Sequence, residues 1–167
     1  MKTSQIPNIH FAQEHSRLKD FEIFNLESLY DRHIEQDPPN KPHRIKFFLM
    51  IYITEGHGTH MIDFEQYDYQ PGSFIFVQRE QVQAFDFKVK PKGQVMMFTQ
   101  AFLDQVHANM RLPNYTPTHL NKHHQPVIKL DQESVLRCQH HLKEITTEYQ
   151  LEQTDPLIIM YLFSSLS

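Results

Sequence analysis

The chain has 167 residues, of which 40% are hydrophobic and 12% aromatic, and its formal net charge is -4 at pH 7. This length and composition suit one folded domain and exclude a disordered chain, and the acidic balance excludes a surface that binds DNA through its own positive charge. The single cysteine, Cys138, excludes an intrachain disulfide, and the N-terminus has no apolar segment typical of a secretory signal. We therefore expect a soluble cytoplasmic domain without a membrane span.

The first hundred residues predict a series of short β-strands. Residues 1–20 are polar and weakly patterned, which indicates an arm or a short edge strand. Segments rich in β-branched and aromatic residues, separated by turn signals, predict strands over 21–26, 44–54, 59–64, 73–77, 81–89 and 94–98. Several short strands at this spacing favour a β-sandwich or barrel.

The pattern changes to helices after residue 98. Thr99 is a predicted N-cap for a helix over about 100–110, and residues 111–130, with three prolines, are expected to be irregular. Asp131 is a predicted N-cap for a helix that runs to about 153, and Asp155-Pro156 opens a third, apolar helix over 157–163. Because the chain stops inside an apolar helix, we expect it to be a fragment of a longer protein.

The stretch TEGHGTHMID, residues 54–63, holds two histidines and two carboxylates and could be a metal site or a hairpin tip. In an extended chain, His57 and His60 lie on opposite faces, roughly 10 Å apart at about 3.3 Å per residue. Gly56 and Gly58 favour a turn, so we interpret the stretch as a hairpin. Cys138 lies on an apolar stripe, which favours a core or interface side chain over a nucleophile.

Three segments in order, PHRIKFF (42–48), YITEGHGT (52–59) and PGSFIFV (71–77), resemble the N-terminal cupin-like sensor domain of AraC-type transcription regulators. The resemblance runs from about residue 21 to 103. It implies a mainly β fold, in which a cupin-like double-stranded β-helix (jelly-roll) barrel is followed by two or three α-helices. The implied organisation is an N-terminal arm over 1–20, an effector-binding barrel over 21–98 and a helical dimerisation region over 99–167, before a helix-turn-helix DNA-binding domain absent from this chain.

The cupin resemblance also bears on metals. Metal-binding cupins carry His-x-His-x3-Glu-x6-Gly, and this frame falls on His43, Ile45, Leu49 and Gly56, while the ligand of their second motif falls on Gln83. Only His43 keeps a ligand, and one imidazole cannot hold an ion that needs three or four donors. The resemblance therefore implies a metal-free barrel with no cofactor, and a protein that is not an enzyme.

The same strand parities predict which side chains line the barrel. The predicted ligand-binding residues are His43, Ile45, Phe47, Leu49, Ile51, Gln83 and Phe85. The lining favours a small, mainly apolar effector over a sugar, although a fully packed core without a cavity remains open.

The second predicted helix carries an apolar heptad stripe. Its members are Val135, Cys138, Leu142, Ile145 and Tyr149. They either pack on the outside of the barrel or form a homodimer interface, and the resemblance favours the dimer.

The leading hypothesis is the effector-sensing and dimerisation domain of a bacterial AraC-type transcription regulator. Its expected partners are a small-molecule effector, a second copy of the chain, and DNA only through the missing domain. One alternative is a stand-alone cupin metalloenzyme with a non-standard ligand set of His43, Glu55, His57 and His60. Another is a regulator that needs no small effector and acts through protein partners.

Overall fold

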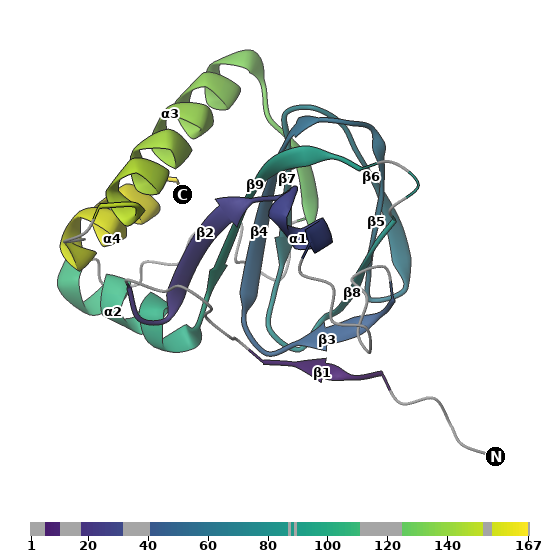
Figure 1. The fold of residues 1–167 in the computed structure, drawn as a ribbon, viewed down its shortest axis with the longest axis horizontal. Helices are drawn as coiled ribbons and strands as arrows, with labels where there is room; N and C mark the ends of the chain where they lie inside the picture. Colours follow the sequence, from purple (N-terminus) through teal and green to yellow (C-terminus); the bar gives the residue numbers. More distant parts are fainter. Residues whose placement is uncertain are drawn as a thin grey trace.

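Two five-stranded sheets form the body of the molecule, and helices pack on the outer face of one of them (Figure 1). The computed structural model describes residues 6–10, 18–31, 41–86, 88, 90–110, 125–151 and 155–166. In spatial order, the first sheet contains β1 (Asn8–Ile9), β3 (His43–Ile45), β8 (Val82–Phe85), β5 (Gly58–Ile62) and β6 (Glu65–Tyr69). The second contains β10 (Val127–Lys129), β7 (Ser73–Val77), β4 (Phe48–Glu55), β9 (Lys92–Phe98) and β2 (Phe21–Asn25). This arrangement confirms the predicted mainly β barrel followed by helices.

The second sheet carries a core on each face because its strands are apolar at both parities. Along β4, Leu49 and Ile51 point between the two sheets, whereas Phe48 and Met50 point towards the helices. We call the apolar side chains between the sheets the inner core; they are Leu26, Ile45, Phe47, Leu49, Ile51, Ile53, Ile62, Tyr69, Ile75, Val77, Phe85, Val95 and Met97. We call those between the second sheet and the helices the outer core, whose phenylalanines are Phe21, Phe48, Phe74, Phe76, Phe98, Phe102 and Phe163.

The helices are α1 (Ser28–Asp31), α2 (Gln100–Met110), α3 (Gln132–Tyr149) and α4 (Pro156–Ser164), and the last three cover the outer core. The predicted caps are present. The Asp131 carboxylate accepts a hydrogen bond from the Ser134 N–H at 2.7 Å, and Asp155 accepts one from the Leu157 N–H at 2.9 Å. Thr99 Oγ1 accepts from the Phe102 N–H at 3.2 Å. No helix in the described ranges is long and apolar enough to cross a membrane.

Several predicted boundaries were wrong. The strand predicted over 44–54 is divided, because the chain bends at 46–47 and passes from β3 in the first sheet to β4 in the second. Residues 111–130 were expected to be irregular, yet Val127–Lys129 forms the strand β10. So short a strand is stable only because its backbone pairs with β7. Helix α3 ends at Tyr149 instead of running to about 153, and residues 152–154 lie outside the described part.

The N-terminal region was predicted as an arm or an edge strand. Asn8–Ile9 forms β1, a parallel edge strand beside β3, which agrees with the second possibility. Strand β6 and the short helix α1 had no counterpart among the predicted elements.

Candidate functional site

The hairpin between β4 and β5 separates the two histidines of TEGHGTHMID. Gly56 has a φ of 108°, a turn conformation that glycine adopts without strain, and His57 is exposed beside it, as predicted for a hairpin tip. His60 lies inside the barrel, where it is only 1% exposed. The ligand set of the metalloenzyme alternative is therefore divided between the barrel interior (His43, His60) and an exposed tip (Glu55, His57). Within the described ranges, no three His, Cys, Asp or Glu side chains are grouped as metal ligands would be.

All seven predicted ligand-binding residues are buried; six lie at inward-facing strand positions and Phe47 lies in the bend between β3 and β4. The apolar five, Ile45, Phe47, Leu49, Ile51 and Phe85, belong to the inner core. The polar two, His43 on β3 and Gln83 on β8, lie directly opposite each other in the first sheet. The structure thus brings together the residues that the strand parities selected, and their role in binding a ligand stays a prediction.

Buried polar side chains gather on the same inner side. The described residues contain five of them, namely Glu22, His43, His60, Ser73 and Gln83. Each lies on the same side of its strand as an apolar residue that belongs to the inner core or packs against it. Glu22 shares its side of β2 with Phe24, Ser73 its side of β7 with Ile75, and His60 its side of β5 with Ile62. The sequence-based prediction missed Glu22, His60 and Ser73. The strands around His60 and Ser73 are buried at both parities, so alternation carries no clear signal for these two residues.

His60 lies in an apolar setting. Its ring meets the Phe85 ring edge-on, with the centroids 4.6 Å apart and an interplanar angle of 76°. Burial lowers the pKa of His60 to about 4, and the neighbouring Gln83 amide acts weakly in the opposite direction. At neutral pH the imidazole is therefore uncharged and offers one hydrogen-bond donor and one acceptor. Neither ring nitrogen, nor Gln83 Oε1, makes a hydrogen bond of ordinary geometry within the described part of the chain.

A groove of about 650 Å³ lies at the seam between the two sheets, and two of the side chains that line it, Tyr69 and Ser73, are buried. It is lined by the hairpin end, by the end of β6 and by β10: His57, Gly58, Thr59, Asp68, Tyr69, Gln70, Ser73, Gln125, Val127 and Lys129. The Tyr69 hydroxyl lies 2.6 Å from the point where a Cβ on Gly58 would be. The Tyr69 side chain can therefore lie against β5 at this point only because residue 58 is a glycine. Gly58 points to the same side of β5 as His60.

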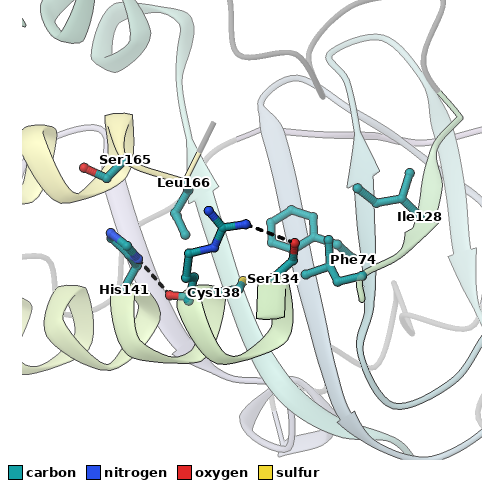
Figure 2. Close-up of a pocket in the computed structure, with 9 residues that line it drawn as sticks. Phe74, Ile128, Ser134, Cys138, His141, Ser165 and Leu166 are labelled. Carbon is teal, nitrogen blue, oxygen red and sulfur yellow. Dashed lines mark hydrogen bonds between the residues drawn. The ribbon is translucent and has the colours of Figure 1, made fainter. Parts of the chain in front are cut away.

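A second, smaller cavity of about 250 Å³ lies outside the barrel, between α3 and the second sheet (Figure 2). Phe74, Ile128 and Leu166 form its apolar wall. Its polar groups are engaged locally, since His141 Nδ1 donates to the Arg137 carbonyl at 2.7 Å and Arg137 Nη2 donates to Ser134 Oγ at 3.4 Å.

The floor of this cavity includes Cys138, which is 8% exposed and lies in the outer core as the apolar stripe predicted. Burial raises the pKa of the thiol to about 12, so it stays protonated at neutral pH, which disfavours a role as a nucleophile.

The apolar stripe of α3 packs inside the chain. Cys138, Leu142 and Ile145 are buried in the outer core, and Val135 and Tyr149 are partly buried against it. The burial of the first three leaves them no surface to offer a second chain. A dimer through this helix would have to use residues other than these three, and dimerisation stays a prediction.

The sequence matches the AraC-like ligand binding domain over residues 28–166, most of the chain. The chain belongs to this family. Its AraC-like fold also matches an apo crystal structure of a ToxT variant from Vibrio cholerae, with 8% sequence identity and a TM-score of 0.50, over 90% of this chain and 55% of that one. At this identity the likeness concerns the fold alone.

Two further AraC-like structures are similar. Wild-type ToxT from Vibrio cholerae with a bound unsaturated fatty acid has 10% identity and a TM-score of 0.48, over 92% of this chain and 55% of that one. The AraC-like transcriptional activator CuxR has 9% identity and a TM-score of 0.40, over 88% and 48%. This chain therefore spans about half the length of these proteins. No curated protein sequence matches it.

The ligand positions of the cupin metal frame converge inside this AraC-like barrel. His43 and Gln83 are paired across two strands, and Ile45 and Leu49 belong to the inner core beside them. Ile45 and Leu49 have no donor atom, so these positions pack instead of coordinating.

Proposed function

We propose that this AraC-like domain is the effector-sensing part of a transcription regulator, and that the barrel interior binds a small, mainly apolar molecule. One observation carries the proposal: an otherwise apolar interior holds the buried polar residues of the described chain, and some of their polar atoms lack hydrogen bonds. Binding sites for small molecules combine apolar walls with a few convergent polar groups in this way. The groove at the barrel seam, which borders the buried Tyr69 and Ser73, is the proposed entrance from solvent.

The second sheet would carry the signal. Leu49 and Ile51 on β4 face the proposed effector. Met50 and Tyr52, on the opposite face of the same strand, belong to the outer core that the helices α2, α3 and α4 cover. A ligand that binds one arrangement of this sheet better than another shifts the helices with it. We propose that the helices pass this shift to a second copy of the chain and to a DNA-binding domain outside this sequence.

A homodimer could use exposed apolar side chains on α4. Leu157, Ile158 and Tyr161 are large, apolar and exposed, with exposed fractions of 52%, 44% and 63%. If α4 forms the dimer, Tyr161→Glu should convert the protein to a monomer in sedimentation analysis. An unchanged mass for this variant would place the interface elsewhere.

We also propose that the protein is not an enzyme. Two of the four cupin ligand positions are occupied by Ile45 and Leu49, which cannot bind a metal or transfer a proton. Elemental analysis of the purified protein tests this proposal. Stoichiometric iron, manganese or zinc would support the metalloenzyme alternative instead.

A matched pair of variants on β4 tests effector binding. Ile51→Phe adds side-chain volume to the inner core. Met50→Phe, at the neighbouring residue, adds side-chain volume to the outer core, and the two wild-type side chains are equally buried. A thermal-shift screen of apolar compounds should find ligands that raise the Tm of the wild-type protein and of Met50→Phe but not of Ile51→Phe. Equal responses of the two variants would contradict a site inside the barrel.

A further inference from the structure

Three polar atoms inside the barrel make no hydrogen bond of ordinary geometry in the described part of the chain. They are the two ring nitrogens of His60, which is 1% exposed, and Oε1 of Gln83, which is 6% exposed. A buried polar group without a partner costs about 1–3 kcal/mol, and native interiors seldom leave one unexplained. Because these atoms belong to neighbouring side chains on β5 and β8, one small group placed beside them can satisfy Gln83 Oε1 and one ring nitrogen of His60 together.

We propose that the effector carries a hydroxyl group that binds between His60 and Gln83, on an otherwise apolar body, which makes it an alcohol or a phenol. This inference rests on the proposed function. A hydroxyl both donates and accepts, so it can donate to Gln83 Oε1 and accept from the imidazole N–H. The register pairs His60 with Phe85 and Ile62 with Gln83, so Gln83 lies diagonally across from His60 on the neighbouring strand. Long side chains reach each other at this spacing.

The charges of the interior disfavour an ionised head group. None of the buried residues in the described ranges is a lysine or an arginine, and the inward-facing titratable groups are His43, His60 and Glu22. His60 is uncharged at neutral pH because burial holds its pKa at about 4. A carboxylate bound at this pair would therefore lose its water beside a neutral imidazole. An ammonium group bound there would lose its water beside the uncharged imidazole of His60 and the uncharged amide of Gln83. An uncharged hydroxyl avoids both costs.

The groove at the barrel seam provides the route to this pair. Its lining includes Gly58 and Tyr69, which are paired across β5 and β6, and His60 follows two residues further along β5 on the same side. Two residues of strand span about 7 Å, so the apolar body of an effector bound at His60 extends towards the groove. Tyr69 covers this entrance and can yield, because the contact with Gly58 is made by the end of its side chain.

The experiment compares three probes of equal chain length, octan-1-ol, octanoate and octylamine, by isothermal titration calorimetry with the purified protein at pH 7. We expect octan-1-ol to bind at least about tenfold more tightly than either charged probe. His60→Phe and Gln83→Leu should each weaken octan-1-ol binding about tenfold and remove the preference, whereas His140→Phe, at an exposed position of α3 outside the barrel, should leave both unchanged.

A spectroscopic measurement keeps the proposal testable if these variants do not fold. In the wild-type protein, the imidazole nitrogen resonances of His60 should shift on addition of octan-1-ol and not on addition of octane. Two results would overturn the proposal. One is equal binding of the three probes, and the other is octan-1-ol binding that is unaffected by His60→Phe and leaves the His60 resonances unchanged. A buried water would then be the partner of these atoms. If another compound from the screen binds wild type but not Ile51→Phe, only the hydroxyl inference fails. If no compound binds, the proposed function fails with it.

Discussion

The two faces of the second sheet are buried to the same degree but differ in chemistry. The outer core is built from apolar side chains, with the Tyr52 hydroxyl and the Cys138 thiol as its polar atoms among the buried residues. The inner core shares its space with Glu22, His43, His60, Ser73 and Gln83. An interior that serves stability alone is better filled by apolar groups, because an unpartnered buried polar atom is costly. The difference agrees with a division in which the outer core supplies most of the stability and the inner core, under the proposed function, supplies recognition.

Ring packing on the outer side supports this division. Phe98 lies at the centre, with ring centroids 4.8 Å from Phe163, 5.3 Å from Phe48 and 5.9 Å from Phe102. These contacts join β9 and β4 to α2 and α4. The helices thus depend on the sheet for their position, which makes the outer core the mechanical link between the barrel and the helical layer.

The largest expected effect is the loss of a ring from the outer core. Phe98→Ala should lower the free energy of unfolding by about 3–5 kcal/mol, because it removes a fully buried side chain and leaves a cavity between sheet and helices. Urea denaturation followed by circular dichroism measures this change. The inner substitution His60→Phe, at the same burial, should cost far less or even stabilise the protein, because it removes unpartnered polar atoms. A loss of 3 kcal/mol or more for His60→Phe would contradict the division between the cores.

The second prediction uses pH to separate the cores. The pKa of His60 is about 4 in the folded protein and about 6.5 in an unfolded chain, so the unfolded state takes up the proton first as the pH falls. The contribution of His60 is therefore fully present above pH 6.5 and is lost between about pH 6.5 and 4, by about 3 kcal/mol. Subtracting the curve of His60→Phe from that of the wild type isolates this loss. Parallel curves for the two proteins would show that His60 is not buried in the neutral form.

Much of this architecture could be predicted from the sequence, because alternation and capping are local signals. Asp131 and Asp155 marked the helix starts, and the parity of 45, 49 and 51 selected the inward side of the barrel. The division of the strand at 46–47 could not be predicted, since both halves are apolar and the change of sheet depends on pairing with distant strands. Strand β10 was missed for the same reason, because three residues form a strand only beside β7.

The interior site was predicted in part. The cupin frame pointed to His43 and Gln83, which proved to be paired, but it drew attention away from His60. The strand signal around His60 was weak, because His60, Met61 and Ile62 are all buried and no alternation of polar and apolar residues marks the inner side. Met61 packs with Val82 and Ala84 on the outer face of the first sheet, a contact that only the tertiary structure reveals.

A third, smaller effect distinguishes two glycines near the barrel rim. In Gly93→Ala the new Cβ would lie 1.9 Å from the carbonyl oxygen of Tyr52, which is backbone and cannot move aside, so we expect a loss of about 1–3 kcal/mol in the free energy of unfolding. In Gly58→Ala the new Cβ meets the end of the Tyr69 side chain, which can rotate, and the change should stay within about 1 kcal/mol. Thermal denaturation of both variants measures the difference. Equal losses would mean that Tyr69 is held rigidly and cannot uncover the groove.

The smallest expected effect tests whether the outer core can be weakened without disturbing the inner one. Asp131→Ala removes the N-cap of α3, whose buried stripe packs on the second sheet, and should cost about 1 kcal/mol of stability. Asp131→Asn keeps an acceptor for the Ser134 N–H and serves as the matched control. Because α3 contacts only the outer face of the sheet, neither variant should change the affinity for octan-1-ol by more than about twofold. A larger change in Asp131→Ala, absent from Asp131→Asn, would show that the start of α3 is itself coupled to the barrel interior through the sheet.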